Sequence, residues 1–534
     1  MMLLNKKGVT MRFSILFLLA SIAIGSTSLA QEDSLYRLDL LHTNDLHSHF
    51  LPFKTDGSSC TYETCSGGFA KIQTVIQQEK KENPNLILLD AGDRFSGTVF
   101  YTLRKGKDIP NLMNEMHYDA MNIGNHDFDD GLDELYKFVQ KSNAPVVSAN
   151  VQFPKNHPLK KEIRPALVIH KNNRQIGIIS LLTKDAKTTS AKADEINLLS
   201  YEEALTPLVN KLKNQGVDII ILLNHIGIDE DIKLAQNSTD IDIIISAHTH
   251  TLLSNNPEEK NAKGGYPLVI KNKNGEKVLI VSAGIGGHHI GKLTAFFDKN
   301  GLVHSFSGDT KPIDTSITPD TKMVKMIEDI QSKVNDILTQ KIFTTTAPIP
   351  LTRNSAFCSE SCYVGEILTD ALLKAGQKAN PNVSLAFLNA GGIRAGFPKG
   401  EITFQHMAQT YPFDSKAVIV KIKGADILSY LNHGLKEYIL DDRTNAFIQA
   451  SGLSYLFSAK ENRVKNIKIN NQPLDMTKEY LVVMPSFLAN GGDNFPKLEI
   501  IQTLKEKTIR EEFISILKEQ KLKPFENRIK KMID

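Results

Sequence analysis

The sequence contains no tryptophan, only four cysteines among 534 residues, and no apolar segment long enough to cross a membrane. Its longest apolar run, residues 13–25, falls short of the roughly 18 to 20 residues that a membrane-spanning helix needs. This excludes a polytopic membrane protein. Apolar residues make up 41% and charged residues 23% of the chain, which excludes a disordered chain, a coiled coil and a collagen. At roughly 100 to 200 residues per domain, the length allows two to four domains.

The N-terminal segment has the features of a secretory signal. Basic side chains precede the apolar run, and Ser28-Leu29-Ala30 after it forms a small-x-small cleavage site. We therefore expect residues 1–30 to be a signal peptide and the mature chain to begin at Gln31, in the periplasm or outside the cell. The alternative is an uncleaved anchor helix. Because residues 528–534 are charged, no apolar tail is available for a lipid anchor, and we expect no stable membrane anchor after cleavage.

Charge argues against nucleic acid as a partner. Residues 1–30 hold three basic and no acidic side chains, which account for the whole formal charge of +3. The mature chain is therefore neutral, whereas nucleic-acid-binding proteins carry basic surfaces.

The four cysteines form two tight pairs, Cys60 with Cys65 and Cys358 with Cys362. In an oxidising compartment, such spacing is typical of local disulfides that close loops. A zinc site is the alternative, although almost 300 residues separate the two pairs and the spacings within them are poor for zinc.

The remaining chain predicts two layered α/β domains joined by a helix. Short apolar segments alternate with helical patterns, and their continuous Ile, Leu and Val content indicates strands buried on both faces. The predicted strands are residues 36–42, 86–90, 121–123, 175–182, 217–223, 241–246 and 278–283 in the first domain, and 385–388, 417–423 and 480–485 in the second.

Residues 303–317 are polar and we expect them to be irregular. Thr318-Pro319 then supplies a cap and a first-turn residue for a helix whose apolar stripe is Met323, Ile327, Ile330, Val334 and Ile337. The predicted organisation is a first domain over 31–317, a linker helix over 318–340 and a second domain over 341–534. The alternative is that this helix belongs to one large domain.

Five polar clusters follow predicted strands of the first domain. They are Asn44-Asp45-Leu46-His47, Gly92-Asp93, Gly124-Asn125-His126-Asp127-Phe128-Asp129, Asn224-His225 and His248-Thr249-His250. A single cluster of this kind is usually a turn or a cap. Because the carboxyl ends of strands form the ligand crevice of open α/β sheets, five such clusters are expected to converge.

Carboxylate, imidazole and amide ligands suit Mn, Zn, Fe, Co or Ni better than a soft thiolate site does. The clusters offer too many ligands for one tetrahedral ion, whereas two ions that share a carboxylate would use them all. Such a pair clamps the attacking and leaving oxygens of a phosphoryl displacement and lowers the pKa of a bound water. The clusters therefore predict metal-assisted phosphoester hydrolysis.

In this order the clusters resemble those of the calcineurin-like metallophosphoesterases. With the second domain included, nearly the whole mature chain resembles the 5′-nucleotidase family of periplasmic UDP-sugar hydrolases and animal ecto-5′-nucleotidases. The resemblance implies one metal held by Asp45, His47, Asp93 and His250, and a second held by Asp93, Asn125, His225 and His248. It also implies a dyad in which Asp129 orients His126. Two residues depart from the family pattern: Asp127 replaces the usual Glu, and His250 stands where Gln or Asn is frequent.

The resemblance extends to substrate binding in the second domain. It implies that Asn389 and Arg394, within Asn389-Ala390-Gly391-Gly392-Ile393-Arg394, contact the substrate, that Phe413 and Phe487 stack on the base, and that Asp493 accepts hydrogen bonds from ribose. Relatives place a phosphate-binding Arg where this chain has Cys358. Arg353, five residues upstream, is the candidate replacement.

The predicted activity is hydrolysis of nucleoside 5′-monophosphates such as AMP by an enzyme with two divalent metals, either Zn, Mn or Co. Alternatives that use the same machinery are cleavage of UDP-sugars or NAD, hydrolysis of nucleoside di- or triphosphates, and 2′,3′-cyclic phosphodiesterase activity. From a different class, the alternative is a nucleotide-binding surface protein without turnover. The sequence does not determine the base preference or the oligomeric state.

Overall fold

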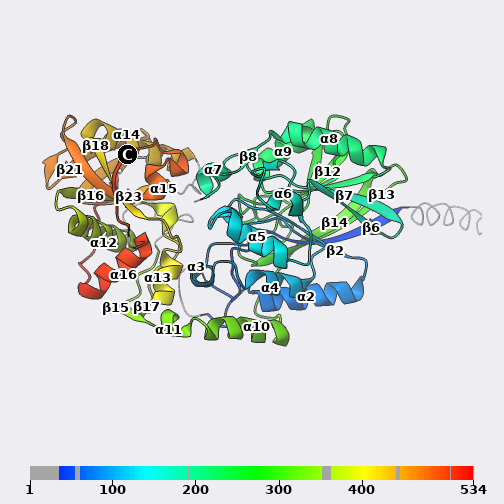
Figure 1. Cartoon of the computed structure of the whole chain (residues 1–534), viewed down its shortest axis with the longest axis horizontal. Helices are drawn as coiled ribbons and strands as arrows, with labels where there is room; N and C mark the ends of the chain where they lie inside the picture. Colours follow the sequence, from blue (N-terminus) through cyan, green and yellow to red (C-terminus); the bar gives the residue numbers. More distant parts are fainter. Residues whose placement is uncertain are drawn as a thin grey trace, which may run out of the picture.

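The computed structural model describes residues 35–54, 60–190, 192–351, 362–440, 446–505 and 507–532. These residues form two layered α/β regions that lie side by side (Figure 1). The predicted signal peptide lies outside them. Among the helices of these residues, none has both the length and the apolar character needed to cross a membrane.

Two six-stranded sheets form the centre of the first region. The first sheet has the order β14 (Val303–Pro312), β13 (His289–Phe297), β1 (Tyr36–Thr43), β2 (Ile87–Asp90), β3 (Ala120–Asn122), β4 (Val146–Val147). The second has the order β11 (Leu268–Lys271), β12 (Lys277–Val281), β10 (Ile243–Ile245), β9 (Ile219–Leu223), β7 (Arg174–Ile179), β6 (Ala166–Lys171). Strands β1 to β4 run parallel to one another, as do β7, β9, β10 and β12.

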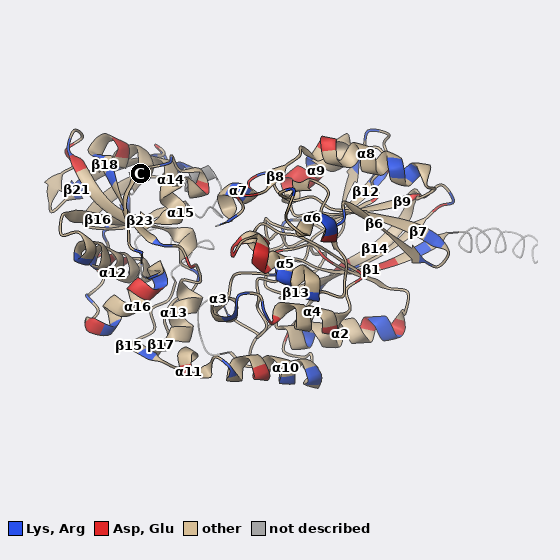
Figure 2. Cartoon of the chain, in the orientation of Figure 1, with Lys and Arg blue, Asp and Glu red and all other residues tan. Residues whose placement is uncertain are grey.

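The sheets face each other and helices cover their outer faces. One apolar core lies between the sheets and extends to α8 (Tyr201–Asn214) and α9 (Ile228–Asn237). Another lies between the first sheet and α2 (Phe69–Glu82), α4 (Ile109–Met116) and α5 (Leu132–Lys141). Every residue of β9 and β10 is buried, which confirms the two-sided burial expected of Ile- and Leu-rich strands. Charged residues of both signs lie on outer helices such as α8 and α10 (Figure 2).

Shorter elements connect these layers. They are α3 (Val99–Arg104), η1 (His126–Phe128), β5 (Val151–Gln152), α6 (Leu159–Glu162), α7 (Ala186–Thr189) and β8 (Asn197–Leu198).

The segment expected to be irregular, residues 303–317, instead contains strand β14, so this prediction was wrong. β14 pairs antiparallel with β13 at the edge of the first sheet. An edge strand of an antiparallel pair is half exposed, and β14 accordingly mixes buried and exposed residues. Its polar composition therefore did not reveal it as a strand.

The predicted linker helix is two helices, α10 (Thr321–Ser332) and α11 (Asn335–Leu338). The cap is Asp320 rather than Thr318, because the Asp320 carboxylate accepts a hydrogen bond of 2.7 Å from the backbone N–H of Met323. Ile337 is 46% exposed and does not continue the predicted stripe, since the chain leaves helical geometry at Val334. α10 packs on α2, and α11 contacts α13 (Phe404–Thr410).

The second region contains a five-stranded sheet in the order β19 (Ile448–Ser451), β16 (Val383–Asn389), β23 (Glu479–Pro485), β18 (Ala417–Lys423), β24 (Ile500–Thr503). A four-stranded sheet adds β22 (Gln472–Pro473), β21 (Arg463–Ile469), β20 (Leu453–Ser458) and β25 (Ile529–Lys531), and β15 (Lys341–Thr345) pairs with β17 (Gly400–Thr403). The other elements are α12 (Tyr363–Ala379), η2 (Ala390–Gly392), α14 (Gly424–Leu440), α15 (Ser486–Ala489), η3 (Gly492–Asn494) and α16 (Ile509–Glu519). One apolar core unites this region.

Candidate active site

The predicted metal-binding residues all lie just beyond the carboxyl ends of parallel strands in the first region. Asp45 and His47 follow β1, Asp93 follows β2, Asn125 follows β3, His225 follows β9, and His248 and His250 follow β10. The two sheets present these strand ends at the same edge, so the strand-end clusters converge there.

The carboxylates and imidazoles form two adjoining groups. Ligand atoms of Asp45, His47 and His250 lie within 4.8 Å of one another, and those of Asp93, His225 and His248 form a second such group. The Asp93 Oδ2 atom lies 3.1 Å from His225 Nε2 and 3.7 Å from His47 Nε2. Asp93 therefore belongs to the second group and also borders the first.

The amide of Asn125 belongs to the second group by position. Its Oδ1 atom lies 2.9 Å from His248 Nδ1 and 3.2 Å from His225 Nε2. The oxygen thus points at the same space as the two imidazoles.

The protonation pattern of the histidines fits a divalent cation. The Nδ1 atoms of His47 and His225 lie 3.3 and 2.9 Å from the backbone carbonyls of Phe95 and Ala91. A carbonyl only accepts, so Nδ1 of each ring carries a proton and Nε2 points toward the group. Burial lowers the pKa of His225, but Asp93 and Asp45 outweigh it and raise the value to about 10, so a divalent cation among these ligands would displace the Nε2 proton of His225. Burial lowers the pKa of His47 to about 4, which keeps this ring neutral. The donor set of imidazole nitrogen and carboxylate oxygen without thiolate suits Zn, Mn or Co.

The backbone at these residues adopts an uncommon conformation. Five of the predicted ligands have left-handed φ angles: Asp45 (50°), His47 (45°), Asp93 (55°), His248 (82°) and His250 (54°). Asp and His tolerate this region better than most residues do. Glycine is required close by, because a Cβ on Gly124 would lie 2.0 Å from the Asp93 carboxylate. Sharp turns of this kind direct the ligands of several loops into one space.

A buried ion-pair network lies behind the metal-binding loops. Arg94 is fully buried, and its guanidinium lies 3.1 Å from Asp90 and 3.3 Å from Asp127. Asp127 also accepts hydrogen bonds from the backbone N–H groups of Gly124 and Phe95, and Asp90 accepts one from Thr43. The network therefore connects the loops that follow β1, β2 and β3.

The predicted dyad forms a direct hydrogen bond. His126 Nδ1 lies 2.8 Å from Asp129 Oδ2, and the other carboxylate oxygen of Asp129 accepts a bond of 3.1 Å from the Ser190 hydroxyl. Burial lowers the pKa of His126, but Asp129 and Asp93 outweigh it and raise the value to about 9. The His126 ring is 5.3 Å from the His47 ring, so the dyad borders the first ligand group.

The predicted substrate residues also lie close together in the second region. Asn389 donates a hydrogen bond of 2.8 Å to the Asp493 carboxylate, and the Arg394 guanidinium lies 5.2 Å from the centre of the Phe413 ring. The ring of Phe487 packs directly on Gly492, where a Cβ would be 2.5 Å away. Burial raises the pKa of Asp493 to about 6 and lowers that of Arg394 to about 10.

The two regions meet beside these residues. Lys105 at the end of α3 forms ion pairs with Asp130 at 3.2 Å and with Asp414, the neighbour of Phe413. The Thr102 hydroxyl donates to the carbonyl of Pro412 at 3.3 Å, and α7 contacts η3. Arg394 also lowers the pKa of His47 and of His126, although burial and nearby carboxylates have larger effects on both pKa values. The substrate residues therefore face the metal-binding loops.

One predicted disulfide is confirmed. Cys60 and Cys65 are bonded, with their Cα atoms 5.6 Å apart. Cys358 and Arg353 lie outside the described residues. Cys362 is described, and it caps α12 by accepting the backbone N–H of Gly365.

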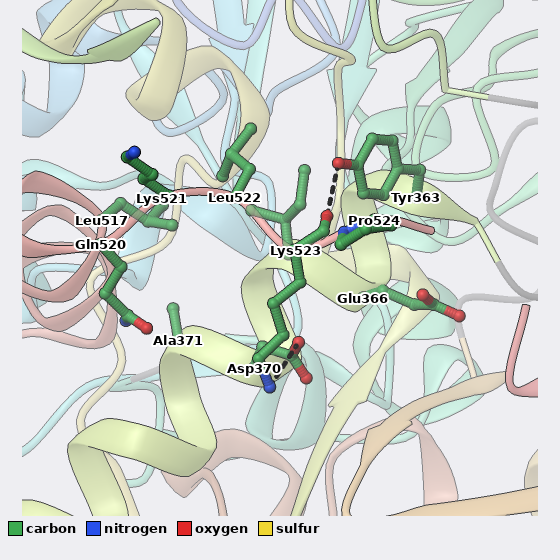
Figure 3. A pocket seen from close by; sticks show the side chains of 11 residues that line it. Tyr363, Glu366, Asp370, Ala371, Leu517, Gln520, Lys521, Leu522, Lys523 and Pro524 are labelled. Atoms are coloured by element: carbon green, nitrogen blue, oxygen red, sulfur yellow. Dashed lines mark hydrogen bonds and ion pairs between the residues drawn. The ribbon is translucent and has the colours of Figure 1, made fainter. Parts of the chain in front are cut away.

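A small hollow elsewhere in the second region contains none of the predicted site residues. It lies between α12 and the chain after α16 (Figure 3). The Tyr363 hydroxyl donates to the carbonyl of Lys523 at 2.6 Å, and the Lys523 ammonium lies 3.8 Å from Asp370. Tyr363, Lys523 and Asp370 thus pair with one another.

Two charged residues at the active site were not predicted from the sequence. Arg94 directly follows Asp93, but sequence alone does not distinguish a buried Arg from an exposed one. Asp185 lies 3.5 Å from His248 Nε2 and follows the strand β7. Its position beyond the end of a strand is the signal that could have identified it.

Comparisons with known proteins agree with this arrangement. Residues 38–252 match the calcineurin-like phosphoesterase family and residues 341–500 match the 5′-nucleotidase C-terminal domain family. A human 5′-nucleotidase is 31% identical over 503 residues, which cover 89% of this chain and 86% of the human protein. The chain belongs to the 5′-nucleotidase family.

Solved structures of 5′-nucleotidases support the assignment. A 5′-nucleotidase precursor from Thermus thermophilus has a TM-score of 0.82 and 30% identity, with 93% of this chain and 100% of that chain covered. An NAD nucleotidase from Haemophilus influenzae has a TM-score of 0.59 and 24% identity, with 91% and 97% covered, and shows the shared fold. As a 5′-nucleotidase family member with a calcineurin-like domain, the chain is a metal-dependent phosphoesterase, and this domain type binds two divalent metals.

Proposed function

We propose that this protein is an exported 5′-nucleotidase that hydrolyses nucleoside 5′-monophosphates, such as AMP, to nucleoside and phosphate. The observation that carries the proposal is the two adjoining ligand groups, with Asp93 in the second group and next to the first, opposite Arg394 and Phe413 of the second region. The proposed domains are residues 31–317 and 341–534, with 318–340 between them.

Two divalent ions, Zn, Mn or Co, would occupy the two groups. The first would be held by Asp45, His47, Asp93 and His250, and the second by Asp93, Asn125, His225 and His248. When bound, the ions supply Lewis-acid stabilisation of the phosphoryl oxygens and lower the pKa of the attacking water.

The dyad has a separate role. Asp129 fixes the proton of His126 on Nδ1, and Asp129 and Asp93 together raise the pKa of the ring to about 9, which favours the cationic form at neutral pH. A cationic ring beside the first ligand group would stabilise charge that develops on the phosphoryl group and on the departing ribose oxygen.

The second region would hold the nucleotide. Arg394 would bind the phosphate, Phe413 and Phe487 would stack on the base, and Asp493, oriented by Asn389, would accept hydrogen bonds from ribose hydroxyls. Arg353 remains the predicted second phosphate ligand.

AMP hydrolysis by the purified mature chain, before and after chelation, tests the function. We expect chelation to abolish phosphate release and Mn²⁺, Zn²⁺ or Co²⁺ to restore it. His126→Ala is expected to lower kcat by about 10²- to 10⁴-fold with metal still bound. His170→Ala is the matched control, because His170 is an exposed residue of β6. AMP hydrolysis that is indifferent to chelator would refute the metal mechanism.

Substrate range and export need separate measurements. A monophosphatase is separated from a pyrophosphatase by measuring phosphate release from AMP, ADP, UDP-glucose and NAD. For UDP-glucose and NAD, a phosphatase is added after the reaction to release phosphate from the cleavage products. Comparable rates on all four would defeat the monophosphatase proposal. N-terminal sequencing of the exported chain is expected to begin at Gln31, and a retained signal would indicate an anchor.

A further inference from the structure

Asp185 is a carboxylate next to the second ligand group but outside the predicted ligand set. It precedes α7 as its N-terminal cap residue, and its Oδ1 atom lies 3.5 Å from His248 Nε2. The Thr183 hydroxyl donates a hydrogen bond of 2.5 Å to the same oxygen. The helix α7 also contacts η3 of the second region. The Asp185 carboxylate is thereby held toward the His248 ring.

The two nitrogens of His248 face different partners. Nδ1 points into the second group, where it lies 2.9 Å from Asn125 Oδ1, and Nε2 points at Asp185. If Nδ1 binds a metal, a neutral ring must carry its proton on Nε2, and a carboxylate is the natural acceptor for that proton.

This arrangement differs from that of His47 and His225. Their outer nitrogens face backbone carbonyls, which no substitution removes. The acceptor of His248 is a side chain, so its contribution can be measured directly. The Asp185 side chain is 48% exposed, so its removal leaves no buried unpaired charge and the fold should tolerate the change.

We propose that Asp185 is a positioning residue for the second metal site. The Asp185 carboxylate accepts a hydrogen bond from the Nε2–H of His248 and so fixes the tautomer and the orientation of that ring. The proposal rests on the proposed dinuclear site. Outer acceptors of this kind typically change metal affinity or activity by about 10- to 100-fold.

The experiment titrates the metal-free, full mature chain with Mn²⁺ alone, in competition with a chromophoric chelator. Asp185→Ala is expected to weaken one of two sites by about 10- to 100-fold and to leave the other unchanged. The Mn²⁺ affinity of Asp185→Asn should lie between those of Asp185→Ala and the wild type, because an amide oxygen still accepts the hydrogen bond from Nε2–H but carries no charge. Asp194→Ala, at an exposed Asp of the next segment, is the control and should bind as the wild type does.

AMP turnover gives a second readout. In Asp185→Ala the loss of kcat should be largest at limiting Mn²⁺ and should shrink as Mn²⁺ approaches saturation. The proposal would be overturned if both sites of Asp185→Ala bound Mn²⁺ with Kd values within twofold of the wild-type values. Equal weakening of Mn²⁺ binding at both sites, together with a lower Tm, would also overturn it. A wild-type chain that binds two Mn²⁺ but does not hydrolyse AMP would refute the proposed function alone, since the titration still decides the role of Asp185.

Discussion

Arg94 offers the sharpest test of how the fold holds the active site. The side chains of Arg94, Asp90 and Asp127 form a network and are all fully buried. Arg94 is the one cation among these three side chains. Arg94→Met keeps much of the side-chain volume and removes the charge. Two carboxylates would then remain buried without their cation, at the base of the loops that carry Asp93 and Asn125.

The size of the effect follows from that burial. Removing one partner of a buried pair costs about 3 to 5 kcal/mol, because the remaining charge is left uncompensated. The pKa values of Asp90 and Asp127 are already raised by burial, and Arg94 is the largest effect that lowers them. For a first domain over residues 31–317, an unfolding entropy of about 2.1 cal/mol/K per residue means that 1 kcal/mol shifts Tm by about 1.7 °C. We therefore expect the unfolding transition of this domain to fall by about 5 to 8 °C.

Differential scanning calorimetry of the full mature chain measures this shift. Arg37→Met is the matched control: Arg37 also pairs with an aspartate, Asp39, but the Arg37 side chain is 60% exposed. Asp39 is buried and keeps its hydrogen bonds from Asn83 and Thr294 when Arg37 is replaced. Loss of an ion pair with an exposed cation costs about 0 to 1 kcal/mol, so the control should lower Tm by no more than about 2 °C. If Arg94→Met lowers Tm no further than Arg37→Met does, the network does not hold the loops as we argue.

Three other predictions concern substrate binding and loop stability. Burial raises the pKa of Asp493 to about 6, and only the ionised form is a pure acceptor for ribose hydroxyls, so the inhibition constant of adenosine should rise as pH falls through 6. Asp493→Asn should remove this pH dependence, and a wild-type inhibition constant that is flat between pH 5 and 7 would contradict the assignment. Lys105→Met removes the partly exposed ion pair with Asp414, so the KM for AMP should change by less than about fivefold; a larger change would mean that the pair controls how the domains face each other. Replacing Cys60 and Cys65 by Ser should destabilise the chain by about 2 kcal/mol in chemical denaturation, and an unchanged midpoint would show that the loop contributes nothing.

Strand burial explains which elements the sequence could predict. Strands such as β9 are buried on both faces and consist of Ile and Leu, so their signal does not depend on their neighbours. β14 is an edge strand whose pairing with β13 supplies its order, and its polar residues carry no such signal. The sequence also did not predict where α10 ends. Ile337 continues the apolar spacing of the helix, although the helix has already ended at Ser332.

For the active site, strand-end positions and the family resemblance together identified residues that the structure places within contact of one another. Parallel strands of one sheet end at a common edge, which brings Asp45 and Asp93 together. His225 follows a strand of the other sheet and reaches Asp45 because the two sheets face each other. Arg94 and Asp185 were not predicted, for different reasons. A buried Arg has no sequence signal of its own. Asp185 does follow a strand, but a single carboxylate at a strand end is usually a turn or cap residue, so its position alone does not mark it as functional.

The conformation of the ligand residues links the chemistry of the site to the stability of the first domain. Left-handed backbone at a non-glycine residue costs on the order of 1 kcal/mol, and Asp45, Asp93 and His248 all adopt it. Burial also raises the pKa of Asp45 to about 6, with a smaller contribution from Asp93, although His225 lowers it. Buried strands behind the loops offset these costs, and divalent ions would offset more of them, because an ion at 100 times its Kd stabilises the folded state by about 2.7 kcal/mol. The residues that would bind the metals are therefore expected to be the least stable part of the domain when the metals are removed.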